Sequence, residues 1–196
     1  MAEAERASIV SAARRASLWC RLGLSAALFL AVSPLRAADA TLEYDVKATF
    51  LYKFAPFVDW PPGSFDQPGA PFVLCIVGAD PFAAPIESAV AGQRIGDRAV
   101  VLRHLSVADG RSGCHLMFLA GSPAQSVAQA LDAVRGSPTL TVTDSAAGTP
   151  PGVVQFVVVG GRINFNIDTV AAAQNHLTIS SKLLALAHAV TQGDRR

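Results

Sequence analysis

The sequence feature that most constrains the fold is a continuous apolar run, FVLCIV, at residues 72–77. An apolar run of this length that is bounded by turn residues is typical of a strand buried on both faces. Such strands occur in parallel sheets that helices cover on either side. Residues 78–81, with sequence GADP, then turn the chain. The run therefore favours an α/β layered domain over an all-helical or half-exposed antiparallel fold.

The rest of the chain supplies the other elements of such a domain. Helical spacing predicts helices at residues 44–55, 82–91, 123–134, 169–174 and from Ser180 or Ser181 to 190, and further apolar runs predict strands at 99–105, 114–120 and 139–142. Two runs at 153–159 and 162–167, joined by Gly160-Gly161, predict a β-hairpin. We expect one α/β domain with a mixed, mostly parallel sheet, a C-terminal β-hairpin and helices on both faces, Rossmann-like in outline.

Three helix starts have candidate capping residues. Ser122 is the expected N-cap of the third helix, with Pro123 at its first position. Asp168 is expected to cap the helix at 169–174, and Ser180 or Ser181 the last one. We expect the last helix to bury an apolar side that includes Leu183 and Val190.

The first helix contains an unusual number of aromatic residues. Its segment YDVKATFLYKFAPFVDWP, residues 44–61, holds six of them. Pro56 should stop the helix near Ala55. The spacing predicts that a core-facing stripe contains Val46, Phe50, Phe54 and Phe57, with Lys47 off it. A core helix alone explains this pattern. The alternative is that the aromatic residues off the stripe, namely Tyr44, Tyr52 and Trp60, form a surface for a partner protein.

Residues 1–40 are typical of a cleaved signal peptide. Arginines precede an apolar stretch at residues 22–32, which is too short to span a bilayer. The small-x-small rule places cleavage near Ala40 or, as a weaker choice, Ala37. We therefore expect an α/β domain at 41–192, a disordered tail at 193–196 and a periplasmic location. A retained membrane anchor is the alternative.

Cleavage of the signal peptide would remove Cys20 and leave two of the three cysteines, Cys75 and Cys114. In an oxidising compartment an isolated pair suggests one disulfide. Two buried free thiols remain an alternative. A metal site that includes His104 or His115 is another, although no C-x-x-C or H-x-x-x-H spacing supports it.

Most classes of active site find no support in the sequence. The chain lacks G-x-S-x-G, G-x-G-x-x-G and P-loop motifs. We therefore expect no catalytic residues, no cofactor and no metal, and a protein that is not an enzyme. A net charge of +1 gives no indication of nucleic-acid binding. The polar row of Arg162, Asn164 and Asn166 on the second hairpin strand consists either of ordinary solvent-facing residues or of partner contacts.

Three segments resemble the YfiR family, also called the DUF4154 domain. The opening segment at 44–61 is similar to the family pattern K-A-x-F-L-Y-x-F-x-x-F-x-x-W-P. LCIVGADPF and CHLMFLAGS resemble its first strand and its cysteine-bearing middle strand. GGRINFNIDTVAAAQNHLTISSKLLALAHAV resembles its closing run. Together they span residues 43–190. Two departures are the sequence GVVQF at 152–156 and the absence of a second cysteine pair before the hairpin.

The resemblance implies a periplasmic α/β protein that often forms homodimers. It implies that Cys75 and Cys114 are the disulfide pair of the family, through which any redox response must act. It also implies a partner, the periplasmic sensor domain of a membrane-bound diguanylate cyclase, which the best-known member represses. The leading hypothesis is therefore a periplasmic regulator of c-di-GMP signalling with partner contacts at Tyr44, Tyr52, Trp60, Asn164 and Asn166. The alternative is a small-molecule sensor with a pocket near residues 78–82 and Asp144.

Overall fold

The computed structural model describes residues 35–82, 84–145 and 148–193. The chain divides into two compact units, Met1–Asp39 and Ala40–Arg196, and the fold below is that of the second. The expected signal peptide falls almost wholly outside the described residues, as does the tail after Gly193, so both stay predictions.

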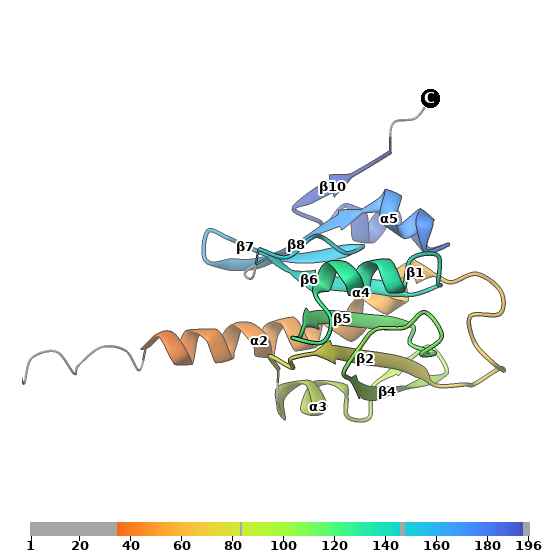
Figure 1. Ribbon diagram of the computed structural model, residues 1–196, viewed down its shortest axis with the longest axis horizontal. Helices are drawn as coiled ribbons and strands as arrows, with labels where there is room; N and C mark the ends of the chain where they lie inside the picture. Colours follow the sequence, from red (N-terminus) through yellow and green to blue (C-terminus); the bar gives the residue numbers. More distant parts are fainter. Residues whose placement is uncertain (1–34, 83, 146–147, 194–196) are drawn as a thin grey trace, which may run out of the picture. The chain divides into compact units, whose positions relative to one another are not determined.

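An eight-stranded sheet forms the centre of the fold, with strand order β10-β8-β7-β6-β5-β2-β4-β3 (Figure 1). Its strands are β2 (Phe72–Gly78), β3 (Arg94–Ile95), β4 (Arg98–Leu105), β5 (Leu116–Gly121), β6 (Leu140–Asp144), β7 (Val154–Val159), β8 (Arg162–Asp168) and β10 (Ala189–Thr191). The strands from β4 to β7 in this order pair in parallel, whereas β7 and β8 form an antiparallel hairpin. The expected fold class, a mixed and mostly parallel α/β sheet, is confirmed.

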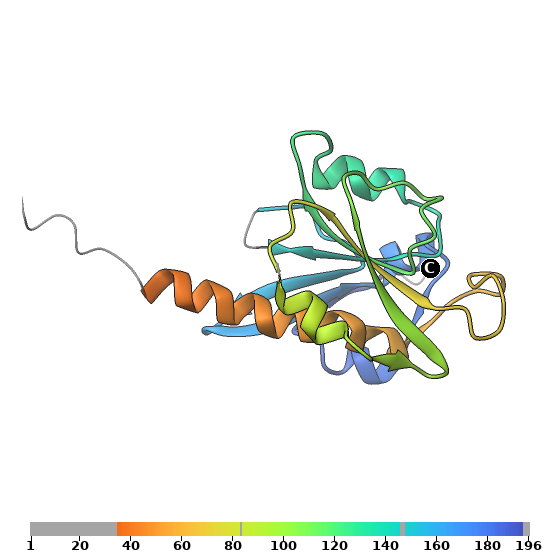
Figure 2. The ribbon, with the colours of Figure 1, turned by 90° about the horizontal axis from the view of Figure 1, so that it is seen from below.

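Helices lie against both faces of this sheet (Figure 2). On one face lie α2 (Leu35–Phe54) and α3 (Ala84–Val90), and on the opposite face lies α4 (Val127–Ala133). Each face has its own apolar cluster. The larger cluster includes Leu51 and Phe54 of α2, and the smaller one packs Val127 and Val134 near α4 against Met117 of β5.

Helix α2 ends where the sequence predicts. Its regular hydrogen bonding stops at Phe54, and the chain continues as a short 3₁₀ helix, Ala55–Phe57, that contains Pro56. Strand β1 (Val58–Asp59) follows and pairs antiparallel with β9 (Thr178–Ile179). This two-stranded sheet was not expected from the sequence. It attaches the end of α2 to the C-terminal part of the fold.

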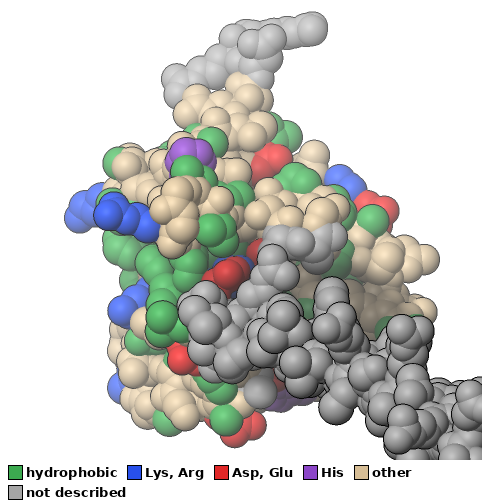
Figure 3. All heavy atoms as spheres, turned by 90° about the vertical axis from the view of Figure 1, so that its left-hand side faces the viewer, with side chains coloured by type: hydrophobic (Ala, Val, Ile, Leu, Met, Phe, Trp, Pro, Cys, Tyr) green, Lys and Arg blue, Asp and Glu red, His purple; other side chains and the backbone are tan. Residues whose placement is uncertain are grey.

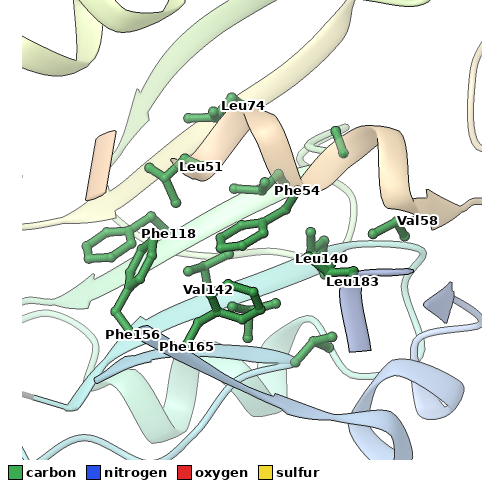
Figure 4. Close-up of a cluster of buried hydrophobic side chains, with 14 of the residues drawn as sticks. Leu51, Phe54, Val58, Leu74, Phe118, Leu140, Val142, Phe156, Phe165 and Leu183 are labelled. Carbon is green, nitrogen blue, oxygen red and sulfur yellow. The ribbon is translucent and has the colours of Figure 1, made fainter. Parts of the chain in front are cut away.

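The buried face of α2 differs from the expected stripe. Leu51 and Phe54 are buried, and they point toward the sheet with Phe118, Phe156 and Phe165 around them (Figure 4). Val46 is 37% exposed, however, and Lys47 is fully buried. The expectation that Val46 points inward and Lys47 outward is therefore wrong. The helix itself is part of the core, as the prediction of a core-facing stripe requires.

Two helix predictions need correction. Helix α4 begins after Ser126, whose side chain forms a capping box with Gln129, so Ser122 is not its N-cap. The Ser122 hydroxyl instead accepts hydrogen bonds from the backbone of Ala124 and Gln125 in the preceding turn. The last predicted helix is shorter than expected. Helix α6 (Ser181–Leu184), capped by Ser180, ends before β10, which pairs with β8.

Helix α5 (Thr169–Gln174) has the expected bounds and cap. The Asp168 carboxylate accepts hydrogen bonds from the backbone nitrogens of Val170 and Ala171. Asn175 follows the helix, and His176 adopts a positive φ of 58°. The chain then turns into β9, so the predicted end of the helix at residue 174 is confirmed.

Candidate functional site

A buried ion pair links α2 to the carboxyl end of β6. Lys47 is fully buried, and its Nζ lies 2.5 Å from Oδ2 of Asp144, the last residue of β6. The same Nζ also pairs with Glu43, one turn earlier on α2 and partly exposed. An unpaired charge at such depth is strongly unfavourable, so the two carboxylates are what allows Lys47 to be buried. The spacing of apolar residues placed Lys47 off the core-facing stripe, so its burial was not expected from the sequence.

Tyr44 belongs to the same polar cluster. Its hydroxyl is hydrogen-bonded to Asp144, and burial, together with the negative charge of Asp144, raises the pKa of Tyr44 to about 12. Its ring packs edge-on against Phe82, with 5.4 Å between centroids, and the Nζ of Lys47 lies 4.7 Å from its centroid. Tyr44 is therefore a half-buried support for the ion pair, and its position does not favour a role as a free partner contact.

The strand ends proposed for a small-molecule pocket are closely packed. A Cβ atom added to Gly78 would lie 2.3 Å from the carbonyl oxygen of Gly121, so the two backbones touch there. Phe82 is 2% exposed and packs edge-on against Phe118 at 4.7 Å. Asp144 is already bound by Lys47. Gly78, Phe82 and Asp144 are thus each in contact with other protein atoms, which does not favour a pocket formed by these three residues.

The other two aromatic candidates are also half-buried. Tyr52 packs against the larger core cluster. Trp60 packs edge-on against Phe72 and Phe65, with centroid distances of 5.5 and 6.3 Å. The indole Nε1 of Trp60 is buried and has no hydrogen-bond partner among the described residues. The three aromatic candidates thus lie at separate places along the edge of the core.

The hairpin asparagines lie on the sheet face opposite α2. Phe165, between them in sequence, packs against Phe50 of α2, and successive side chains of a strand point to opposite faces. The Nδ2 of Asn164 donates to the carbonyl of Arg162, 3.1 Å away. The Oδ1 of Asn166 is buried and has no partner within the described part of the chain. The structure therefore does not bring the asparagines and the aromatic candidates onto one surface.

An exposed apolar surface instead lies where α2 meets the hairpin. Leu42 is 64% exposed, Val46 37% and Val158 49%, and Phe50 and Ile163 are half-buried beside them. We call these five residues the α2–hairpin face. Hydrophobic side chains gather on this side of the molecule, with Lys and Arg side chains at the margin (Figure 3). Phe50 joins the two parts, because its ring centroid is 6.4 Å from those of both Phe156 and Phe165.

A shallow apolar hollow runs along α2 within this surface. Its volume is about 290 Å³, and it is lined by Asp45, Val46, Thr49, Phe50 and Lys53. The helical spacing of Val46 and Phe50 was visible in the sequence, and both residues were assigned to the core because apolar stripes usually are. Leu42, four positions before Val46, was not part of the predicted stripe.

The two cysteines form a disulfide bond. Cys75 of β2 and Cys114, two residues before β5, have Cα atoms 6.0 Å apart, and both are buried in the smaller core cluster. The pairing inferred from the family resemblance therefore agrees with the structure. Among the residues described, no three His, Cys, Asp or Glu side chains are grouped as metal ligands. No helix in the described part of the chain is long and apolar enough to cross a membrane.

The chain matches a known protein family. A family model described as YfiR/HmsC-like, DUF4154, matches residues 44–188. The matched range contains both cysteines, the Lys47–Asp144 pair and all of the α2–hairpin face except Leu42. No curated protein matches the chain.

Proposed function

Since the chain belongs to the YfiR/HmsC-like family, we propose that it is an exported regulator that inhibits a membrane-bound diguanylate cyclase. It would act by binding the periplasmic sensor domain of that enzyme. The observation that carries this proposal is the family match, because members of this family regulate enzymes that make c-di-GMP. The buried disulfide supports the export, because disulfides persist mainly in oxidising compartments.

The α2–hairpin face is the surface that we propose for the partner. Apolar side chains at the centre and basic side chains at the margin are a common arrangement in protein interfaces. Val46 and Val158 are exposed and contribute little to the hydrophobic core, so we attribute their apolar character to contact with a partner. Tyr52 and Trp60 are proposed as secondary contacts, because each is half-buried and keeps part of its ring accessible.

Inhibition requires more than binding. A ligand shifts a two-state enzyme only if its affinity differs between the two states. We therefore propose that the α2–hairpin face binds the inactive conformation of the sensor domain more tightly than the active one. Redox control would act through Cys75–Cys114, because this disulfide joins β2 to the segment before β5 at the centre of the sheet.

The test combines partner capture with a cellular readout. Val46→Asp and Val158→Asp place a charge on the proposed face, and Val107→Asp is the matched control, because Val107 is 44% exposed elsewhere. We expect each face variant to weaken binding to the purified sensor domain at least about tenfold, which corresponds to about 1.4 kcal/mol. Cellular c-di-GMP should rise with the face variants and stay low with Val107→Asp.

Two results would contradict the proposal in different ways. If deleting the protein leaves c-di-GMP unchanged in a strain that contains the cyclase, the function is wrong. If deletion raises c-di-GMP but both face variants still repress, the function stands and the surface is wrong. Tyr52→Ala and Trp60→Ala then show whether the secondary contacts form the interface instead. Light scattering of the purified protein tests the homodimer expected from the family.

A small-molecule sensor is the second candidate. A cavity of about 210 Å³ lies between α4 and α5, with Arg135, Thr141, Gly152 and Asp168 among its lining residues. A smaller cavity that also includes Gly152 and Asp168 contains Asn166, whose buried Oδ1 has no partner among the described residues. A thermal-shift screen with nucleotides and amino acids tests this function. No stabilisation by any of them would count against it.

A further inference from the structure

A buried histidine lies beneath the loop that follows β1. His115, 8% exposed, stacks almost parallel to Phe65, with 4.3 Å between ring centroids and 13° between the planes. Phe72 stacks against the same imidazole at 5.3 Å. Phe65 belongs to residues 61–71, which we call the 61–71 loop, and Phe72 begins β2. The imidazole therefore lies where the loop contacts the sheet.

Both ring nitrogens of His115 form hydrogen bonds that fix its protonation. The backbone nitrogen of Val73 donates to Nδ1 at 3.0 Å, so Nδ1 has no proton. Nε2, 3.0 Å from the carbonyl oxygen of Ser64, must then donate to it. His115 is thus neutral, with its proton on Nε2, and it connects the loop to the first residues of β2. A second proton can enter only at Nδ1, where the Val73 N–H already points.

Arg98 of β4 is the second anchor of the loop. Its guanidinium lies 3.9 Å from the ring centroid of Phe65 and donates to the carbonyl of Ala70 at 2.7 Å. A positive charge on His115 would therefore be repelled by a fixed cation beside the same ring. Asp66, on the loop itself, acts in the opposite direction. The loop is anchored by contacts that favour neutral His115.

We propose that His115 is an acid-sensitive clamp that releases the 61–71 loop when it becomes protonated. The proton comes from solvent and binds to the Nδ1 lone pair. The hydrogen bond from Val73 is then lost, and two N–H groups face each other. The loop leaves the sheet and exposes Phe65 and the ring of Trp60 that packs against it. This regulation goes beyond the proposed function and does not depend on it.

The direction of the pH dependence follows from the surroundings of the imidazole. Burial lowers the pKa of His115 below its ordinary value of 6.5; the Ser64 carbonyl and Asp66 raise it, whereas Arg98 lowers it further. In the open loop the imidazole is solvated and regains its ordinary pKa. The closed form thus binds fewer protons than the open form between pH 6.5 and the lowered pKa. The opening constant should rise by up to about tenfold per pH unit in that window.

The experiment measures loop opening by hydrogen exchange of the full-length chain. Exchange rates of the loop amides and of Val73, corrected for intrinsic pH dependence, give the opening constant from pH 8 to pH 4. His115→Gln removes the titrating group, and His104→Gln is the matched control, because His104 is exposed and pairs with Asp80 away from the loop. We expect the acid-induced rise in wild type and in His104→Gln, and a flat profile in His115→Gln.

An optical and an NMR measurement complete the test. In a Trp19→Phe background Trp60 is the only tryptophan, so its emission should shift to longer wavelength over the same pH window. If His115→Gln does not fold, NMR of the wild-type chain decides: the His115 ring and the Val73 amide should titrate with one midpoint below 6.5. An acid-induced rise that persists in His115→Gln, or a Val73 amide that stays unchanged while His115 titrates, would overturn the proposal.

Discussion

At the scale of single residues, Lys47 is the clearest test of what stabilises this fold. Its ammonium is fully buried between Asp144 and Glu43. Lys47→Met removes the cation and with it the opposite charge beside the largely buried carboxylate of Asp144. We expect the free energy of unfolding to fall by about 3–5 kcal/mol, the usual cost of breaking a buried pair. Urea unfolding followed by circular dichroism measures this change.

The control for this prediction lies on the same helix. Lys53→Met removes an exposed lysine of α2 and should change the stability by less than about 0.5 kcal/mol. The double variant Lys47→Met with Asp144→Asn removes both charges of the buried contact and should recover part of the loss, since the remaining carboxylate, Glu43, is partly exposed. Equal effects of the two lysine variants would show that the buried pair does not stabilise the fold.

Sequence patterns identified the buried residues only where their character was apolar. Phe54 is buried as its spacing predicts, and the isolated pair Cys75 and Cys114 was correctly suspected of bonding. Lys47 could not be found in this way, because a lysine on a helix is normally solvated. Its partner Asp144 lies 97 positions further along the chain. Nothing in the local sequence indicates that these two charges meet.

At the scale of structural elements, the connection between β6 and β7 is unusual. These strands pair in parallel, yet only residues 145–153 connect them, fewer than the dozen or so residues usual for a parallel crossover. Two buried hydroxyls hold this connection against the sheet. The Thr143 Oγ1 accepts from the backbone nitrogen of Gly152, and the Thr141 Oγ1 from that of Val153, each at 3.0 Å.

Thr143→Val should therefore destabilise the protein although it keeps the shape of the side chain. The Gly152 N–H would be left buried without a partner, at a cost of about 1–3 kcal/mol. Thr49→Val is the matched control, because the hydroxyl of Thr49 donates to the Asp45 carbonyl near solvent. Thermal unfolding of both variants measures the difference. A Thr143→Val variant as stable as the control would contradict this role for the hydroxyl.

The sequence predicted elements well where their signals are local. The Gly160-Gly161 hairpin and the strand at 72–77 were both found. The start of α4 was misplaced because Ser122 and Ser126 can both cap a helix, although Gln129, three residues after Ser126, was a usable signal. Strand β10 was missed because three residues form a strand only when β8 offers them an edge.

At the scale of the whole molecule, the disulfide should provide a large share of the stability. It closes a loop across 39 positions, between β2 and the segment just before the neighbouring strand β5. On the chain-entropy model this closure is worth roughly 4 kcal/mol. We expect urea unfolding with a reductant present to show a loss of that size. A Cys75→Ala/Cys114→Ala variant should be equally destabilised and insensitive to reductant, and an unchanged midpoint after verified reduction would contradict the prediction.

The fold class was predictable as a whole, whereas the surface was not. Apolar runs alternating with helical spacing suffice to indicate a layered α/β sheet. The α2–hairpin face needs two segments more than a hundred positions apart, around Val46 and Val158, to lie side by side. The sequence pattern shows that both segments are apolar. It does not show that both stay exposed to solvent in the folded protein.

The long separation between α2 and its partners also affects how the chain can fold as it is made. Phe50 and Phe54 emerge early in synthesis, but Phe156 and Phe165, against which they pack, emerge about a hundred residues later. Contacts between residues so far apart in the sequence form slowly. Until they form, the apolar surface that they will bury is exposed to aggregation. The apolar face of α2 must therefore stay exposed on the nascent chain until the hairpin has been synthesised. A chaperone that holds this helix should raise the yield of folded protein.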